Sequence, residues 1–387
     1  MVEPVADLLA AAQAETGLDD YGVDTFREGL EILVRSLRDE ARLNTVGEYV
    51  LRTRIVAALS NRLRIEDTYR RHPEIDDVEV RPPLLGLGLP RTGSTALSNL
   101  LAEDPGARSL RMWESSEPCP PPSTVVGPDP RIAAAEAMVQ AQDAIAPRLR
   151  ALVPSSATGP MECLDLMGLD FKTHLHQAFA RIPSYSSWFL DTDLTTAYAY
   201  ERRVLKLLAW GEPTRPWRLK SPTHLLFLDA WDEVFPGTRF VMTHRDPTEV
   251  MVSVTDLYCE FRRMCSDDVD AAEVSELNVV HWTVAMERAL AFRDKGNDLR
   301  FYDMDFRAMQ RDPLGEVQRL YAWLGEPVTP EFAAGMQRWW HDNAETREQN
   351  VYPDAGELGL DLDAVRPQFA DYVARAKQWT RTEGASQ

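Results

Sequence analysis

The chain has 387 residues, of which 44% are hydrophobic, and its 61 acidic against 42 basic side chains give a formal net charge of −19. This length exceeds the roughly 100 to 200 residues of an ordinary domain, so we expect two domains or one α/β domain with helical extensions. The composition is that of a folded globular protein, and the acidic balance argues against a surface that follows the phosphates of DNA or RNA. A small anionic ligand can still bind, because oriented backbone N–H groups and one or two cations act locally.

The sequence shows no targeting or membrane segment. From Met1 to Leu18 it carries acidic residues instead of a basic region followed by an apolar stretch, so no signal peptide is predicted. No run approaches the roughly 20 apolar residues of a membrane span. The four cysteines lack CxxC spacing and nearby histidine pairs, which predicts buried thiols and no metal site. We therefore expect a cytoplasmic protein.

The predicted elements begin with two helices. Apolar residues recur at helical spacing from Thr25 to about Glu66. Arg81-Pro82-Pro83 breaks this pattern, and the short apolar run 84–88 suits a buried parallel strand. We place a domain boundary near residues 73–83, with 1–78 as an N-terminal helical extension and 79–387 as the main domain.

Strands and helices then alternate along the chain. A helix follows the loop 90–95, and a largely helical insertion is expected over about 118–215, with an Ala-rich helix at about 131–152. Further strands are predicted at 217–220, 239–243 and 299–304, and further helices at 223–234, 248–258, 314–324 and 331–343. This alternation predicts an α/β fold, a mostly parallel sheet flanked by helices with right-handed crossovers.

The loop between the first strand and its helix has the pattern of a phosphate-binding loop. Residues 88–95 read GLPRTGST, which matches GxxxxGK[ST] except that Ser94 stands at the lysine position. A helix N-terminus offers backbone N–H groups and about half a positive charge, and both attract phosphate. A turn without a ligand is the simpler alternative. The predicted phosphate-binding residues of this P-loop-like sheet are Arg91, Thr92, Gly93, Ser94 and Thr95.

The missing lysine bears on the reaction. An enzyme that transfers phosphoryl groups from a nucleotide uses that lysine against the charge on the β and γ phosphates, together with Mg²⁺. Here the nearby cation is Arg91, three residues earlier. A P-loop-like small-molecule kinase is therefore an alternative and not the first hypothesis.

A second candidate site stands at the end of a later strand. Arg245 follows the predicted strand 239–243, at the edge where open α/β sheets bind ligands. Ser253 lies eight residues further, just over two turns along the next predicted helix. The arginine and the hydroxyl can contact one phosphate, although an arginine beside an aspartate is also common as a structural ion pair.

Together, PRTGST at 90–95, WRLKSPTHL at 217–225 and THRDPTEVMVS at 243–253 resemble the sulfotransferase superfamily, in particular its bacterial branch. The resemblance covers about residues 80–375 and implies the donor 3′-phosphoadenosine 5′-phosphosulfate. The loop 90–95 would then bind the 5′-phosphosulfate end, with Arg91 where cytosolic relatives often have lysine. Arg245 and Ser253 would bind the 3′-phosphate.

The C-terminal segment of the family is represented less clearly. No RKGxxGDWK segment of the cytosolic kind is present. Contacts from the C-terminus to the donor therefore stay open, with Arg347 as one candidate. The matching positions are Tyr352, Gly359, Leu360, Val365, Phe369 and Tyr372.

Transfer of a sulfuryl group also needs in-line alignment, charge stabilisation and a general base. His224 resembles the histidine of the family's Lys-Thr-His signature, whose histidine is the base, but additional residues separate it from Lys220. Glu114 resembles the position from which some bacterial and heparan-type members use a glutamate base. For His224 a role in capping or packing on its helix is equally open, and for Glu114 a structural role. Lys220 either donates to the sulfuryl oxygens or forms an ion pair.

Two other groups of residues favour structural roles. His174 and His176 would point about 200° apart on a helix and cannot share a metal. The aromatic stretch 185–200 either forms the core of the insertion or lines an acceptor pocket, and we favour the core.

The leading hypothesis is thus a metal-independent sulfotransferase that acts on a hydroxyl or amine of a small molecule. The two alternatives are a P-loop-like small-molecule kinase and a non-catalytic nucleotide-binding protein. The sequence specifies neither the acceptor nor the oligomeric state.

Overall fold

The computed structural model describes residues 2–343 and 352–382. The chain divides into two compact units, each made of three separate segments. The first comprises Met1–Val80, Leu110–Thr214 and Tyr258–Val269, and the second comprises Arg81–Ser109, Arg215–Leu257 and Asp270–Gln387. The predicted N-terminal extension thus shares a unit with most of the predicted insertion, whereas the division of the chain at 78/79 stays a prediction.

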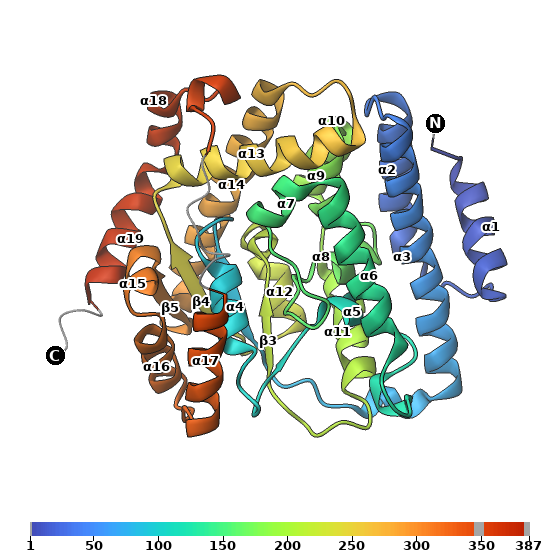
Figure 1. Cartoon of the computed structure of the whole chain (residues 1–387), viewed down its shortest axis with the longest axis horizontal. Coiled ribbons are helices and arrows are strands. Elements are labelled where there is room, and N and C mark those ends of the chain that lie inside the picture. Colours follow the sequence, from blue (N-terminus) through green and yellow to red (C-terminus); the bar gives the residue numbers. More distant parts are fainter. Residues whose placement is uncertain (1, 344–351, 383–387) are drawn as a thin grey trace. The chain divides into compact units, whose positions relative to one another are not determined.

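The first unit is built from helices. Its N-terminal part contains α1 (Val5–Thr16), α2 (Arg27–Asp39) and α3 (Thr45–Arg71), and α1 lies along α3 (Figure 1). The two helices expected between 25 and 66 are α2 and α3, while α1 was not predicted. The other helices of this unit are α5 (Met112–Ser116), α6 (Pro130–Ile145), α7 (Pro147–Leu152), α8 (Leu164–Gly168), α9 (Leu175–Phe179), α10 (Pro183–Asp191) and α11 (Thr195–Ala209).

Local sequence explains the bounds of these helices. In α2, Leu30, Leu33, Val34 and Leu37 are buried at the spacing of one helical face. Asn44 caps α3 by accepting a hydrogen bond from the backbone N–H of Gly47. The single helix expected over 131–152 is wrong, because α6 ends before Pro147, which has no N–H to continue it and starts α7 instead.

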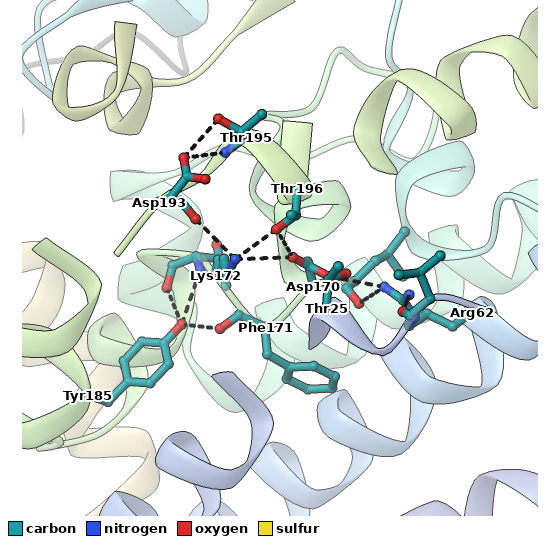
Figure 2. Close-up of polar contacts among 12 residues, drawn as sticks. Thr25, Arg62, Asp170, Phe171, Lys172, Tyr185, Asp193, Thr195 and Thr196 are labelled. Atoms are coloured by element: carbon teal, nitrogen blue, oxygen red, sulfur yellow. Dashed lines mark hydrogen bonds and ion pairs between the residues drawn. The ribbon is translucent and has the colours of Figure 1, made fainter. Parts of the chain in front are cut away.

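A buried ionic network joins the N-terminal helices of the first unit to its insertion (Figure 2). Asp170 accepts hydrogen bonds from the hydroxyls of Thr25 at 2.5 Å and Thr196 at 2.8 Å. Its carboxylate also lies 3.3 Å from Arg62 Nη1 and 3.6 Å from Lys172 Nζ. The side chains of Arg62 and Asp170 are 0% exposed. A buried ion pair persists only when such additional hydrogen bonds offset its desolvation.

The second unit contains a parallel sheet. Its strand order is β2-β3-β1-β4-β5, and every neighbouring pair is parallel. The central strand β1 is buried at all of its positions, as expected of a strand covered on both faces. These strands confirm the predicted α/β fold. Their bounds are β1 (Leu84–Gly88), β2 (Arg108–Ser109), β3 (Trp217–Lys220), β4 (Arg239–His244) and β5 (Phe301–Asp305).

Helices cover both faces of this sheet. Successive strand residues point to opposite faces, and Val241 packs in a core with Leu97 of α4 (Ser94–Leu101) and Leu320 of α16 (Pro313–Leu324). On the opposite face, Phe240 contacts Phe292 of α14 (Ala271–Phe292) with 5.8 Å between the ring centroids. The remaining helices of the second unit are α12 (Leu228–Val234), α15 (Phe306–Arg311), α17 (Pro330–Asp342), α18 (Leu362–Val365) and α19 (Ala370–Thr382), and α13 (Pro247–Cys265) begins in this unit and ends in the first.

The observed elements of the second unit differ from the predicted ones in several places. The helix expected over 223–234 is a 3₁₀ turn, η4 (Pro222–Leu226), followed by α12. The sequence interpretation also omitted α14, which packs against η4 and α12, and it omitted α15, α18 and α19. Within 2–343 and 352–382, no helix is both long enough and apolar enough to cross a bilayer.

Candidate functional site

The loop from β1 to α4 depends on two glycines. Gly88 has a φ of 132°, and a Cβ there would lie 2.5 Å from the carbonyl oxygen of Thr243. Gly93, the N-cap of α4, has a φ of 87°, and its Cβ would meet the Phe306 ring at 3.1 Å. Both positions therefore require glycine, for the backbone conformation and for the close approach.

The polar residues of this loop have different environments. Thr92 is buried, and its hydroxyl donates to the carbonyl of Leu89 at 2.7 Å and lies 2.6 Å from the Thr243 hydroxyl. A contact from Thr92 to a ligand would thus use its backbone N–H. Ser94 begins α4, is buried, and precedes the exposed Thr95. The first N–H groups of a helix have no partner within the helix, which suits them to an anion.

Three of the predicted residues are brought together next to this loop. Arg91, in the left-handed region with a φ of 65°, donates from Nε to the hydroxyl of Ser253 at 3.0 Å. Arg245 donates from Nη1 to the carbonyl oxygen of Arg91 at 2.9 Å. Two cations and a hydroxyl therefore converge at the carboxyl ends of β1 and β4.

The side chain of Arg245 is held from several sides. Its Nε lies 3.0 Å from the carboxylate of Glu249, one turn along α13, and its guanidinium carbon lies 4.6 Å from the centre of the Phe306 ring. Arg307 approaches the same carboxylate at 3.6 Å. A cation over an aromatic face and beside a carboxylate loses much of its rotational freedom, so Arg245 is oriented within this site.

Lys220 and His224 also belong to the second unit. Lys220 ends β3, is 7% exposed, and passes so close to Gly86 that a Cβ there would lie 3.1 Å from Lys220 Cγ. His224 is 0% exposed in η4, with its ring 4.6 Å from that of Trp231. Burial lowers the pKa of His224 to about 3, so the imidazole is neutral at neutral pH. The packing role left open for His224 is thus present, and its role as base stays a prediction.

Glu114 lies in the first unit. It is 4% exposed within α5, and its carboxylate accepts a hydrogen bond from the backbone N–H of Arg111 at 3.0 Å. This contact is half of a capping box at the start of α5. Glu114 therefore has a structural role at the start of α5, and its catalytic role also stays a prediction.

The remaining predictions concern the cysteines, the aromatic stretch 185–200 and Arg347. All four cysteines are buried thiols outside any disulfide, as predicted. Tyr185, Phe189 and Tyr198 are 0% exposed, so these aromatic residues form core. Arg347 lies outside the described residues.

Two residues of this site were missed at the sequence level. The i, i+4 spacing of Arg245 and Glu249 was a usable signal for their ion pair. Nothing local pointed to Phe306, because it reaches the loop only through the pairing of β4 with β5.

Known proteins resemble the chain over most of its length. The profile of the sulfotransferase family matches residues 82–330. Sulfotransferase STF9 from Mycobacterium avium superposes with a TM-score of 0.88 at 30% identity, covering 97% of each chain. Sulfotransferase STF1 from Mycobacterium tuberculosis H37Rv superposes with a TM-score of 0.81 at 30% identity, covering 96% of this chain and 99% of that one.

A curated relative matches a shorter stretch. The omega-hydroxy-beta-dihydromenaquinone-9 sulfotransferase Stf3 of Mycobacterium tuberculosis is 32% identical over 131 residues, and the match spans 33% of either chain. The chain thus spans about a third of the length of the curated relatives it matches. The family profile and the two superpositions, by contrast, cover most of the chain. The chain belongs to the sulfotransferase family.

Proposed function

We propose that the chain transfers a sulfuryl group from 3′-phosphoadenosine 5′-phosphosulfate to a hydroxyl or amine of a small molecule. The observation that carries this proposal is the convergence of Arg91, Arg245 and Ser253 at the carboxyl ends of β1 and β4. Paired cations and a hydroxyl at this edge of a parallel sheet suit the phosphate groups of a nucleotide. Membership of the sulfotransferase family supports the same conclusion.

The loop fits the 5′ end of this donor. Gly93 has no side chain where the backbone turns into α4, so a phosphate can approach the N–H groups that follow it. Arg245 and Ser253 would bind the 3′-phosphate, and Arg91 connects them to the loop. This phosphate distinguishes the donor from ATP, so we expect Arg245 to select between the two nucleotides.

The residues near the sheet edge would stabilise the charge that moves in the reaction. An acceptor oxygen forms a new bond to sulfur while the bond from sulfur to the bridging phosphate oxygen breaks, and 3′-phosphoadenosine 5′-phosphate leaves. Negative charge grows on that bridging oxygen, where the N-terminus of α4 and the ammonium group of Lys220 would stabilise it. The acceptor proton passes to a general base.

The two candidate bases make different predictions. Glu114→Gln should lower kcat by about 10²- to 10⁴-fold if Glu114 is the base. His224→Asn should do so if His224 is the base, although an imidazole with a pKa of about 3 is a weak acceptor of protons. The variant that lowers kcat without changing donor affinity identifies the base.

The acceptor is proposed as a class. The name of Stf3 describes an acceptor that carries an ω-hydroxyl group. We accordingly favour a hydroxyl over an amine and would begin an acceptor panel with hydroxylated small molecules.

Calorimetric titration tests the donor. The purified protein is titrated with 3′-phosphoadenosine 5′-phosphate and, in parallel, with ATP plus Mg²⁺. Micromolar binding of the first and weak binding of the second are expected. The reverse preference would favour the kinase alternative, and donor binding without transfer to any acceptor of a broad panel would favour a non-catalytic nucleotide-binding protein.

A further inference from the structure

His244, the residue directly before Arg245, belongs to a buried series of hydrogen bonds that the proposed reaction does not use. His244 ends β4 and is 3% exposed, and its Nε2 lies 2.7 Å from Oδ1 of Asp303 on β5. Arg293 donates to both oxygens of the same carboxylate, at 2.7 Å and 2.8 Å. This series of hydrogen bonds therefore starts at the Asp303 carboxylate, which Arg293 holds in place next to the donor site.

Asp303 is ionised in this arrangement. Burial by itself raises the pKa of a carboxyl, but hydrogen bonds from Arg293 and His244 outweigh it and hold the pKa of Asp303 below its ordinary value. A carboxylate only accepts hydrogen bonds, so Nε2 of His244 carries the hydrogen in their contact. The second ring nitrogen, Nδ1, is then left for another partner.

Tyr372 of α19 lies at that second nitrogen. Its hydroxyl is 3.2 Å from Nδ1 of His244, and the two rings stack with 5.8 Å between their centroids. Burial raises the pKa of Tyr372, so the hydroxyl keeps its proton. The hydrogen on Nε2 of His244 is assigned from its carboxylate partner, and the Tyr372 hydroxyl faces the other ring nitrogen.

We propose that Tyr372 is a positioning residue of the donor site: its hydroxyl and ring hold the side chain of His244, the residue directly before Arg245, and thereby make α19 part of the donor-binding apparatus. This inference rests on the function proposed above. Arg245 can present its guanidinium to a phosphate only if its main chain is held at the end of β4. Deleting the hydroxyl leaves Nδ1 of the buried His244 without this partner.

The anchoring of α19 provides a matched control. Arg375, one turn beyond Tyr372 on the same helix, pairs with Asp294 through two contacts, at 3.0 Å and 2.5 Å. The guanidinium of Arg293 also lies 3.5 Å from the ring centre of Trp379. Loss of the Arg375 pair therefore removes one anchor of α19 while the Tyr372 hydroxyl and its contact with His244 remain.

The experiment compares Tyr372→Phe with Arg375→Gln by calorimetry with 3′-phosphoadenosine 5′-phosphate and by hydrogen–deuterium exchange of the segment 243–250. We expect Tyr372→Phe to weaken binding about tenfold and to speed exchange at Arg245, because a buried hydrogen bond is lost. Arg375→Gln should leave the nucleotide affinity and the exchange rate at Arg245 within about twofold of their values in the unchanged protein, even if it lowers the thermal stability.

Two results would overturn the inference. In one, Tyr372→Phe binds and exchanges like the unchanged protein. In the other, both variants weaken binding equally, which would assign the effect to the general stability of α19. If the unchanged protein does not bind the nucleotide at all, the proposed function fails, and the exchange rate at Arg245 still decides whether Tyr372 positions it.

Discussion

Arg91 and Ser253 are 162 residues apart in the chain, yet Nε of Arg91 donates to the Ser253 hydroxyl at 3.0 Å. This bond ties the phosphate loop to α13 and so connects the two halves of the candidate site. Arg245 completes the connection, since its Nη1 donates to the carbonyl of Arg91. The proposed contacts to the two ends of the donor are therefore coupled through Arg91.

The first prediction concerns Arg245. Arg245→Ala should weaken the binding of 3′-phosphoadenosine 5′-phosphate by about 2–3 kcal/mol, because charge-assisted hydrogen bonds to a phosphate are lost. Isothermal calorimetry at fixed salt measures the change. Arg307→Ala is the control, since Arg307 approaches the same Glu249 at 3.6 Å but is 76% exposed. Unchanged affinity in Arg245→Ala would exclude Arg245 from the 3′-phosphate site.

The second prediction concerns the start of the loop. Gly88→Ala should lower the free energy of unfolding by about 3 kcal/mol or more, because strain at its φ of 132° adds to an overlap with the Thr243 carbonyl. Gly17→Ala is the control: its φ is 71° with no atom within 4 Å, so it should cost only about 1 kcal/mol. Urea denaturation compares the two, and equal costs would contradict the steric argument.

The third prediction concerns the ionic network of the first unit. Asp170→Asn should lower the free energy of unfolding by about 3–5 kcal/mol, because it leaves Arg62 buried without its carboxylate. Asp24→Asn removes an exposed partner of Arg27 and should cost less than about 1 kcal/mol. Denaturant midpoints of both variants test this prediction. A small effect of Asp170→Asn would show that the other hydrogen bonds of the network are enough to stabilise the buried Arg62.

The fourth prediction concerns pH. Glu201 is 0% exposed beside the Cys163 thiol, and burial raises the pKa of its carboxyl from 4.5 to about 8. Between these values the unfolded chain releases a proton that the folded chain keeps. Stability from this group is therefore complete below about pH 4.5 and falls as pH rises through about pH 8, by at most about 1.4 kcal/mol per pH unit.

Glu201→Gln should remove that slope. Urea denaturation at about pH 5 and about pH 8 gives the comparison, in which the variant should gain stability over the unchanged protein at the higher pH. Identical pH profiles for the two proteins would mean that the Glu201 carboxyl titrates in its ordinary range.

Local sequence determined much of this protein. The apolar run 84–88, the glycines of the loop and the run 239–243 predicted the central strand, the turn into α4 and the strand before Arg245 correctly, because each depends on backbone conformation or burial over a few residues. Phosphate binding at this edge stays a prediction. Proline positions likewise explain where α6 gives way to α7. The order of motifs was enough to predict the family.

Tertiary structure alone decided which side chains meet. Phe306 beneath Arg245, Tyr372 beside His244, and Asp170 beside Arg62 come from segments far apart in the chain. Burial likewise changed the chemistry of His224, whose lowered pKa has no counterpart in its local sequence. Strand pairing and helix packing fix such contacts through the shape of the whole core, whereas sequence periodicity reports only which face of an element is apolar.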